Sequence, residues 1–304
     1  MIRFLDSPLP ECFLSSLVRR YELHRDVQRS TVSQKRASLN CFERFLKRSA
    51  QLRDLERETI VGFLNWYRER AEPGTVATKR RDLLTLWEFA YDERLVTQPP
   101  QRIRAVRQPQ KVPDGWDLAE LRQLLAATER LPGTYRYLGD RRNRVDVPKG
   151  LVLRALVRGF LCTGLRRNAL LKVLKSELRP DGVFAARWQN AKTWSEQTKK
   201  LDAEAVAAVQ AVHAYAEFRT LFPAPSKKYL NADWRKLLEL AGLRSEGNVL
   251  AQHLRRTASS YVEQQRPGTA RHFLGHKTPG LAERRYLVPR IVRPELIEGP
   301  RLDL

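Results

Sequence analysis

The chain has 304 residues, of which 42% are hydrophobic and 30% are charged, a balance that allows a sizeable buried core and excludes wholesale disorder. No apolar run approaches the roughly 18 residues of a membrane-spanning helix, and an early charge and two prolines exclude a signal peptide. The cysteines Cys12, Cys41 and Cys162 form no Cys-x-x-Cys pair, which disfavours a disulfide framework or a structural zinc site. We therefore expect a soluble protein of a reducing cytoplasm.

Positive charge is the strongest compositional signal, because 56 Lys and Arg face 34 Asp and Glu and give a formal net charge of +22. Such an excess can serve nucleic acid, an anionic membrane or an acidic protein. A membrane-surface protein typically concentrates its charge in one amphipathic helix or tail. Here residues 1–113 hold 22 basic and 14 acidic side chains, and residues 114–304 hold 34 and 20. Because both halves are basic, we expect a long nucleic acid duplex as the partner and no membrane.

Residues 1–100 are predicted to form a helical domain. Apolar residues recur at helical spacing over 31–47, over 60–67 and from Thr75 onward, and a further helix is expected over 11–24. The exposed faces of these helices supply candidate DNA contacts, for which a merely solvated helical face is the alternative explanation: Lys35, Arg36, Lys79, Arg80 and Arg81.

Residues 101–113 are predicted to be a basic, proline-rich linker. Four prolines fall within residues 98–113 and no apolar period crosses them. The arginines between these prolines, Arg102, Arg104 and Arg107, can lie along a phosphate backbone and join the candidate DNA contacts.

Residues 114–304 predict a mainly α-helical domain with a small β-sheet, of the α+β class. The helical pattern recurs in five segments: 117–128, 151–162, 203–219, 227–241 and 249–264. The two strand candidates are 183–188 and 191–201, whereas the Gly-, Arg- and Asp-rich stretch 131–149 is expected to be a loop or an insertion.

Three short motifs in this half carry residues that could take part in chemistry. Residues 163–166 read Thr-Gly-Leu-Arg, which places an arginine after a glycine turn at the start of a helix. Residues 252–257 read Gln-His-Leu-Arg-Arg-Thr and put His253 and Arg256 on one helical face at i, i+3. Residues 274–276 read Leu-Gly-His and are followed ten residues later by Tyr286.

In this order the motifs resemble the tyrosine recombinases, or phage-type integrases, whose catalytic half carries Arg, Lys, His-x-x-Arg, His or Trp, and Tyr. The resemblance covers nearly all of residues 117–304, and the N-terminal half is similar to the helical core-binding domain of that family. The positions that match are Arg166, Lys192, His253, Arg256, His276 and Tyr286. Lys192 matches a lysine that the family keeps on a β-hairpin, with Lys199 and Lys200 as alternatives on the same hairpin.

The resemblance implies a site-specific recombinase that cuts and rejoins DNA through a 3′-phosphotyrosine on Tyr286. The two matched arginines would bind the non-bridging phosphate oxygens in bidentate fashion. His253 would act as base or proton relay, His276 would hydrogen-bond a phosphate oxygen, and Lys192 would protonate the leaving 5′ oxygen. Because the phosphotyrosine conserves the bond energy, neither ATP nor a metal is required.

The resemblance also implies a homotetramer on two DNA sites, with accessory DNA-bending or directionality factors. Two alternatives use the same fold: a DNA-relaxing enzyme like the type IB topoisomerases, and a non-catalytic DNA-binding relative. The i, i+4 pair His272 and His276 has metal-compatible spacing but lacks the glutamate of a His-Glu-x-x-His site. The DNA target and the genetic element that carries the gene stay open.

One position departs from the family pattern. The family has an acidic residue three positions after its first arginine, where this chain has Ala169, and Glu177 follows eight residues later. We therefore expect a slower enzyme, or a site that another group completes.

Overall fold

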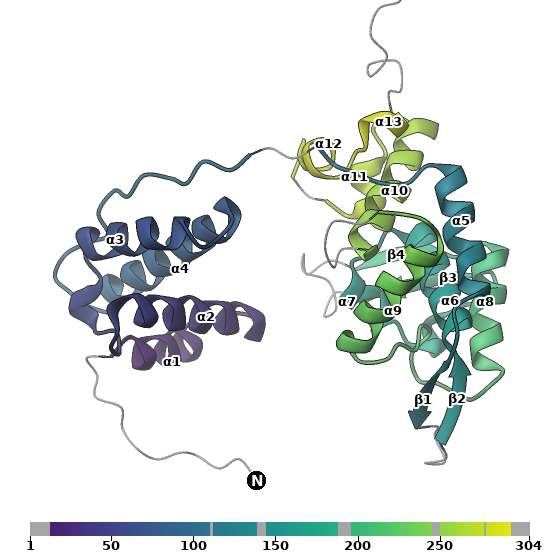
Figure 1. Cartoon of the computed structure of the whole chain (residues 1–304), viewed down its shortest axis with the longest axis horizontal. Coiled ribbons are helices and arrows are strands. Elements are labelled where there is room, and N and C mark those ends of the chain that lie inside the picture. Colours follow the sequence, from purple (N-terminus) through teal and green to yellow (C-terminus); the bar gives the residue numbers. More distant parts are fainter. Residues whose placement is uncertain are drawn as a thin grey trace, which may run out of the picture. The chain divides into compact units, whose positions relative to one another are not determined.

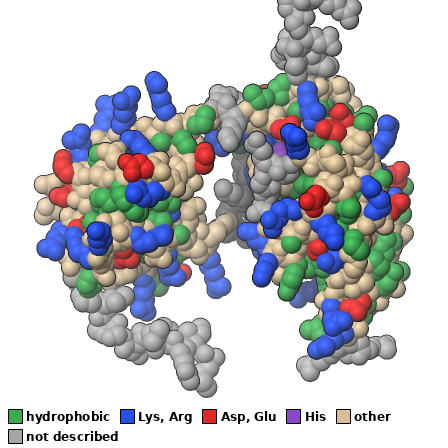
Figure 2. All heavy atoms as spheres, viewed as in Figure 1, with side chains coloured by type: hydrophobic (Ala, Val, Ile, Leu, Met, Phe, Trp, Pro, Cys, Tyr) green, Lys and Arg blue, Asp and Glu red, His purple; other side chains and the backbone are tan. Residues whose placement is uncertain are grey.

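A computed structural model of the chain describes residues 13–109, 112–138, 144–187, 196–244, 250–276 and 278–292. The backbone divides into two compact units, Met1–Gln110 and Lys111–Leu304 (Figure 1). Among the described residues, no helix has both the length and the apolar character needed to cross a membrane. Lys and Arg side chains are spread over the visible face of each unit, with Asp and Glu among them (Figure 2).

The N-terminal unit is helical, as predicted. Its elements are α1 (Leu14–His24), α2 (Arg29–Leu46), the 3₁₀ turn η1 (Leu52–Asp54), α3 (Arg57–Arg68) and α4 (Pro73–Asp92). The apolar stripes recognised in the sequence meet in one core, in which Phe42 of α2, Phe63 of α3 and Trp87 of α4 are fully buried. Pro73 begins α4, where its fixed φ suits the first turn and its missing N–H costs nothing.

The beginning of the predicted linker packs against this unit. Ile103 is only 5% exposed and belongs to the helical core. Its carbonyl accepts a hydrogen bond from the guanidinium of Arg80 at 2.5 Å, and the indole N–H of Trp87 donates to the carbonyl of Gln98 at 2.9 Å. The chain is therefore fixed to the helical unit up to residue 103, while the assignment of 101–113 as a linker stays a prediction.

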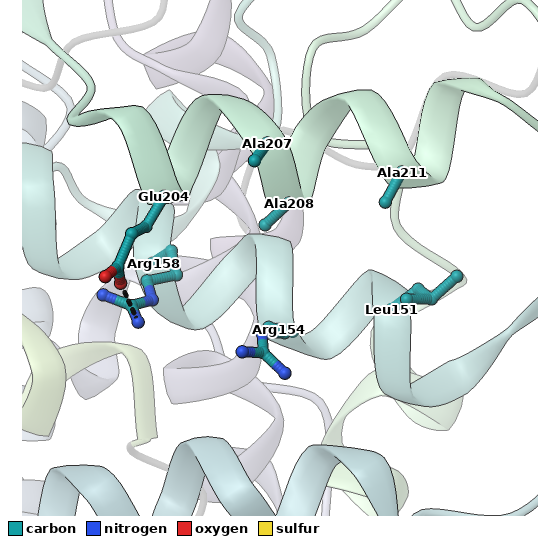
Figure 3. A pocket seen from close by; sticks show the side chains of 7 residues that line it. All are labelled: Leu151, Arg154, Arg158, Glu204, Ala207, Ala208 and Ala211. Atoms are coloured by element: carbon teal, nitrogen blue, oxygen red, sulfur yellow. Dashed lines mark ion pairs between the residues drawn. The ribbon is translucent and has the colours of Figure 1, made fainter.

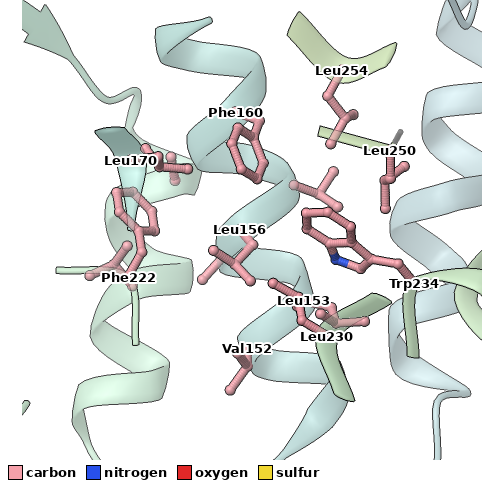
Figure 4. Packing of buried hydrophobic residues seen from close by; sticks show 14 of the residues in the cluster. Val152, Leu153, Leu156, Phe160, Leu170, Phe222, Leu230, Trp234, Leu250 and Leu254 are labelled. Carbon is pink, nitrogen blue, oxygen red and sulfur yellow. The ribbon is translucent and has the colours of Figure 1, made fainter. Parts of the chain in front are cut away.

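The C-terminal unit is built around one apolar helix. Its helices are α5 (Leu118–Glu129), α6 (Lys149–Thr163), α7 (Arg167–Leu170), η2 (Lys175–Glu177), α8 (Ala203–His213), α9 (Lys227–Leu240), α10 (Leu250–Gln265), α11 (Ala270–Leu274), α12 (Leu281–Arg285) and α13 (Pro289–Val292). Leu156 and Phe160 of α6 lie between Phe222 on one side and Trp234 of α9 on the other (Figure 4). Because α6 is buried on several faces, its ends are held in place, and its C-terminal end carries the first arginine motif.

Two antiparallel two-stranded sheets complete this unit. β1 (Thr134–Leu138) pairs with β2 (Arg144–Pro148), and β3 (Val183–Ala186) pairs with β4 (Gln197–Lys200). The second hairpin confirms the strand prediction. The first hairpin corrects the expected loop over 131–149: Tyr135 and Val147 are buried opposite each other, so an alternating pattern was present beneath the polar composition.

The helix expected over 203–219 ends at His213. Beyond it the chain becomes extended, because Thr220 forms an isolated β-bridge with Leu174. The N–H of Leu221 donates to the carbonyl of Val173 at 2.8 Å, which replaces helical hydrogen bonding by pairing with a distant segment. Tertiary contacts therefore override local helix propensity there.

Candidate active site

The turn after α6 presents the first predicted arginine. Gly164 adopts φ +57°, and a Cβ at this position would collide with the ring of Phe273, so the turn requires glycine. Arg166 follows as the N-cap residue of α7. The glycine thus brings the end of α6 against α11 and places Arg166 at their junction.

Arg255 of α10 is the most buried cation of the cluster, with 3% exposure. Its Nη1 donates to the carbonyl of Gly164, and its Nη2 donates to the carbonyl of Leu274 at 3.0 Å. Burial, and secondly the charge of Arg166, lower the pKa of Arg255 to about 10, which leaves it charged at neutral pH. One guanidinium therefore joins the turn after α6, helix α10 and the end of α11.

His276 lies against Arg255 in a defined protonation state. The Nη2 of Arg255 is 3.2 Å from the Nε2 of His276. A guanidinium can only donate, so Nε2 accepts and the ring proton resides on Nδ1. Nδ1 is buried and has no hydrogen-bond partner among the described residues. Burial first, then Arg255 and Arg166, lower the pKa of His276 to about 4 against the opposing charge of Glu283. The ring is therefore neutral at pH 7.

Tyr286 stands at the C-terminal end of α12, next to both groups. Its ring centroid is 4.8 Å from that of His276, and the Cζ of Arg255 is 5.1 Å from the centroid of the Tyr286 ring. The hydroxyl of Ser260 on α10 donates to the carbonyl of Arg256 at 2.8 Å and accepts the N–H of Val288 at 2.8 Å, and it lies 3.4 Å from the carbonyl of Tyr286. The tyrosine is thus tied to the helix that carries Arg255.

A cavity of about 420 Å³ opens at this cluster. It is lined by Arg166, Arg167, Lys227, Asn231, Trp234, Ala251, Gln252, Arg255 and Tyr286. Four of these side chains are cationic and none is a carboxylate. Arg167 is oriented by a 3.0 Å hydrogen bond to the Oδ1 of Asn231. The site is therefore suited to an anion that reaches the Tyr286 hydroxyl.

The structure brings together four of the six predicted catalytic residues: Arg166, Arg256, His276 and Tyr286. Lys192 lies outside the described residues.

Neither residue of the predicted His253 and Arg256 pair belongs to the lining of this cavity. His253 packs with its ring centroid 5.2 Å from that of Trp116, on the face of α10 that contacts the start of this unit. Arg256 is half-buried; burial lowers its pKa, while the charges of Tyr286 and Asp114 oppose that shift.

Arg255 and Gln252 are the residues that sequence reasoning missed. They repeat the same i, i+3 spacing one position earlier, and both line the cavity with Tyr286. The i, i+3 spacing alone is therefore compatible with two pairs on α10, Gln252 with Arg255 or His253 with Arg256. The signal that separates them is burial, because Arg255 is buried in the core and Arg256 is not.

Two neighbouring positions bear on the departure at Ala169. Ala169 is buried in the core of the unit. Glu177 accepts the N–H of Leu174 at 2.8 Å and pairs with Arg187, so it is engaged elsewhere and does not replace the missing acidic residue.

Lys199 of β4 borders the site from another side. It is buried, it donates to the carbonyl of Phe273, and its Nζ is 4.7 Å from the centroid of the Phe273 ring. Burial, and secondly Arg255, lower the pKa of Lys199 to about 8. The β3–β4 hairpin is therefore attached to α11, directly before the turn that carries His276.

The predicted DNA contacts of the helical unit fall into three groups: buried, partly buried and exposed. Lys35 and Lys79 are buried: the Nζ of Lys35 lies 4.8 Å from the ring centroid of Tyr21, and Lys79 donates to the carbonyl of Ala37 at 3.1 Å. Lys35 faces α1 and Lys79 faces α2, which removes their ammonium groups from a surface partner. Arg80 is partly buried through its bond to Ile103. The exposed members are Arg36, Arg81, Arg102, Arg104 and Arg107, of which Arg36 pairs with Glu22 at 2.7 Å.

A second cavity, of about 480 Å³, lies between α6 and α8 (Figure 3). Small side chains of α8, Ala207, Ala208 and Ala211, form one wall, and Arg158 pairs with Glu204 at its end. None of the predicted catalytic residues lines it. Among the described residues, no group of three or more His, Cys, Asp or Glu is arranged to hold a metal ion, which includes the surroundings of His272 and His276.

No protein-family model matches the sequence, and no curated protein matches it significantly. Solved structures match nearly the whole chain. A lambda integrase dimer bound to a COC′ core site superposes with a TM-score of 0.69 at 19% identity, covering 96% of this chain and 80% of that one. The XerH site-specific recombinase in a post-cleavage complex on palindromic difH gives 0.67 at 18% identity, covering 93% and 82%.

The Tn1549 transposon integrase, residues 82–397, in complex with circular intermediate DNA gives a TM-score of 0.64 at 11% identity, covering 95% of this chain and all of that one. These matches include both the N-terminal helices and the α+β region. The chain therefore has the fold of the lambda integrase and Xer recombinase structures, with N-terminal helices followed by a mainly helical region that contains small antiparallel sheets.

Proposed function

We propose that this chain is a tyrosine-type DNA strand transferase that cuts and rejoins DNA at specific sites. The observation that carries the proposal is the convergence of Arg166, Arg255 and His276 around Tyr286. These residues come from four separate segments, and only the fold brings them together. A buried cationic site beside a tyrosine hydroxyl is what attack on a phosphodiester requires.

In the proposed reaction, Tyr286 is the residue that forms a covalent bond to the DNA. The Tyr286 oxygen attacks phosphorus, the bond from phosphorus to the 5′ oxygen breaks, and a 3′-phosphotyrosine and a free 5′-hydroxyl result. Arg166 and Arg255 stabilise the charge that grows on the non-bridging oxygens, and His276 accepts from Arg255 and helps to hold its guanidinium in place. A 5′-hydroxyl of another strand then attacks the phosphotyrosine and restores the phosphodiester.

Arg255 takes the arginine position of the His-x-x-Arg pattern in this proposal, in place of Arg256. Gln252 then occupies the position of the histidine, three residues earlier. Lys192 remains the proposed general acid for the 5′ oxygen. It belongs to the segment between β3 and β4, and β4 is attached to the site through Lys199.

Double-stranded DNA is the proposed substrate, bound by a homotetramer on two sites. Lambda integrase has been crystallised as a dimer on a core site and as a tetramer on a Holliday junction. In this chain the exposed arginines of the helical unit supply phosphate contacts, and Arg104 and Arg107 line a groove of about 470 Å³ together with Arg68.

The test is covalent capture of DNA. The full chain is incubated with a pool of nicked duplexes whose central sequence is randomised, and adducts that survive denaturation are isolated and sequenced. We expect the wild type to enrich one sequence, and Tyr286→Phe to bind the enriched duplex equally well without forming any adduct. An adduct that persists in Tyr286→Phe would assign the nucleophile to another residue, and the absence of any wild-type adduct would contradict the proposed function.

A further inference from the structure

The imidazole next to Tyr286 is not available as a base. The Nε2 of His276 accepts from Arg255 at 3.2 Å, and its Nδ1 carries the ring proton. The two neighbouring arginines and burial also oppose protonation of this ring, since they lower its pKa to about 4. The lone pair of Nε2 is therefore occupied by Arg255, and His276 is not available to take the proton of the Tyr286 hydroxyl at neutral pH.

The second place where a base is expected holds an amide. Gln252 lines the same cavity as Tyr286 and Arg255, and an amide is not a proton acceptor at neutral pH. The one histidine of α10, His253, lies against Trp116 and is not part of the cavity lining. The arrangement on α10 thus presents a neutral hydrogen-bonding group where an imidazole would otherwise stand.

The charged groups around Tyr286 are mostly cations. Arg255 faces it from α10, with its Cζ 5.1 Å from the centroid of the Tyr286 ring. Arg256 is the next residue of that helix and is near enough for the charge of Tyr286 to affect its pKa. The charge of Arg166, at the start of α7, helps to lower the pKa values of Arg255 and His276. Lys199 of β4 is also near this group, since the charge of Arg255 helps to lower its pKa.

Two carboxylates lie farther out. The charge of Glu283 on α12 partly offsets the lowering of the His276 pKa. The charge of Asp114 likewise offsets the lowering of the Arg256 pKa, and its carboxylate is 3.7 Å from the guanidinium of Arg290. Among the residues that the structure describes, no Asp or Glu lines the cavity.

We infer that Tyr286 is activated by the positive field of Arg255 and Arg256 rather than by an imidazole base, with Gln252 serving as a neutral hydrogen-bond donor to the phosphate. This inference rests on the proposed function. Hydroxide from solvent takes the phenol proton and becomes water, the phenolate oxygen bonds to phosphorus, and the bond to the 5′ oxygen breaks as that oxygen takes a proton from Lys192, the proposed general acid. Catalysis by charge stabilisation replaces catalysis by proton transfer at the nucleophile.

The test is the pH dependence of single-turnover cleavage. The enriched duplex is made with sulfur in place of the 5′ bridging oxygen at the scissile phosphate, because a thiolate leaves without a proton and the rate then reports only the nucleophile. Without a base, we expect the rate of adduct formation to rise roughly tenfold per pH unit between about pH 6 and about pH 9. A rate that is constant above about pH 7 in the wild type, with the same plateau in Arg256→Gln, would overturn the inference, because the plateau would then belong to a base of lower pKa and not to a phenol in the field of the arginines.

Two single substitutions make this test more specific: one replaces glutamine by histidine at position 252, and the other replaces histidine by glutamine at position 253. Gln252→His restores an imidazole beside Tyr286, so its profile should level off above about pH 6.5, with a gain of roughly tenfold over wild type at pH 7. His253→Gln is the matched control one residue along, and it should keep the wild-type slope. A Gln252→His profile parallel to that of the wild type, or a His253→Gln profile with a different slope, would overturn the inference.

Thermal melts establish that both variants are folded before the rates are compared. The outcomes also separate the two proposals. No wild-type adduct at any pH would contradict the proposed function itself, whereas a wild-type adduct that forms with a flat profile shared by Arg256→Gln would leave that function standing and contradict only the activation by arginine.

Discussion

Arg255 and Arg256 are neighbours in the sequence with different surroundings. Arg255 is buried and gives both terminal nitrogens to carbonyls of two other segments, whereas Arg256 is half-buried at the edge of the cluster. A buried, preorganised donor acts more strongly on developing charge than an exposed one, because little solvent screens it. The chemical contribution of the two residues should therefore differ by much more than their sequence positions suggest.

Substituting each arginine by glutamine tests this difference. We expect Arg255→Gln to slow single-turnover cleavage by roughly 10²–10³-fold, the range seen when one preorganised donor is lost. Arg256→Gln should cost about tenfold, since it only weakens the field at Tyr286. Affinity for the enriched duplex and the melting temperature are measured in parallel. A larger loss of rate at Arg256 would return the catalytic arginine to the register first predicted from the sequence.

His276 connects the site to the pH dependence of stability. Its pKa in the folded chain is lowered to about 4, whereas an unfolded histidine has a pKa of about 6.5. Below about pH 6.5 the unfolded chain therefore binds more protons at this position, and the free energy of unfolding falls as the pH falls toward 4. The contribution of His276 is fully present above about pH 6.5.

We expect His276→Gln to lose less stability than the wild type when the pH is lowered from about 6.5 to about 4.5. Urea denaturation at several pH values measures the difference between the two proteins. His272→Gln, at an exposed position of α11, is the control and should follow the wild type. A difference between wild type and His276→Gln that stays constant over this range would mean that folding does not oppose protonation of His276.

At the level of elements, the glycine turn after α6 determines where Arg166 and Arg255, the two proposed phosphate-binding arginines, stand. Gly164 has φ +57° and leaves no room for a Cβ against Phe273, and its carbonyl is a hydrogen-bond acceptor for Arg255. Gly242, at the end of α9, has a similar φ of +68°, but a Cβ there would meet nothing within 4 Å. Alanine substitutions at Gly164 and Gly242 therefore separate two contributions to the free energy of unfolding: the left-handed backbone, which both positions share, and the collision with Phe273, which occurs only at Gly164.

Gly242→Ala should therefore cost only the conformational term, about 1 kcal/mol of unfolding free energy. Gly164→Ala should add roughly 1–3 kcal/mol for overpacking, and it should also slow cleavage because the Arg255 guanidinium and the α11 turn must shift. Urea denaturation and single-turnover rates measure both effects. Equal destabilisation of the two variants would show that α6 and α11 separate easily at this turn.

The elements with strong apolar periodicity could be predicted from the sequence, and the structure confirms them, from α2 to the long apolar α6. The β1–β2 ribbon could not be predicted, because its turn residues dominate the composition and its alternation spans only five residues in each strand. The end of α8 could not be predicted either, since it depends on pairing between Thr220 and Leu174.

The candidate site also contains some features that could be predicted from the sequence and others that could not. The turn at Gly164 and the spacing from His276 to Tyr286 are local in sequence and could be recognised there. The choice between Arg255 and Arg256 depends on which one is covered by segments about 20 and 90 residues away. Likewise, a periodic pattern marks Lys35 and Lys79 as polar helix residues but does not show that they face another helix, where the structure buries them.

At the level of the whole molecule, the segment that leads out of the helical unit determines how the two units are connected. Ile103 anchors that segment in the helical core, whereas Arg107, Gln108 and Pro109 are exposed. Proteolysis requires several residues around the scissile bond to unfold locally, so packed bonds are cut later than free ones. Trypsin can cut after Arg102, Arg104, Arg107 or Lys111, which lie on both sides of the anchor.

We expect the first tryptic cut to fall after Arg107 or Lys111, with cuts after Arg102 and Arg104 delayed by the packing of Ile103. Ile103→Ala, which removes roughly 2–4 kcal/mol of local packing, should make all four sites comparably fast. Val112→Ala removes a similar side chain from a position that is 72% exposed, and it should leave the order unchanged. Addition of the enriched duplex should protect the segment if its arginines bind phosphate, as proposed. Timed digests with mass spectrometry of the fragments measure this order. A first cut after Arg102 would show that the anchor is open in solution, and a first cut within 150–180 would place the boundary between the units elsewhere.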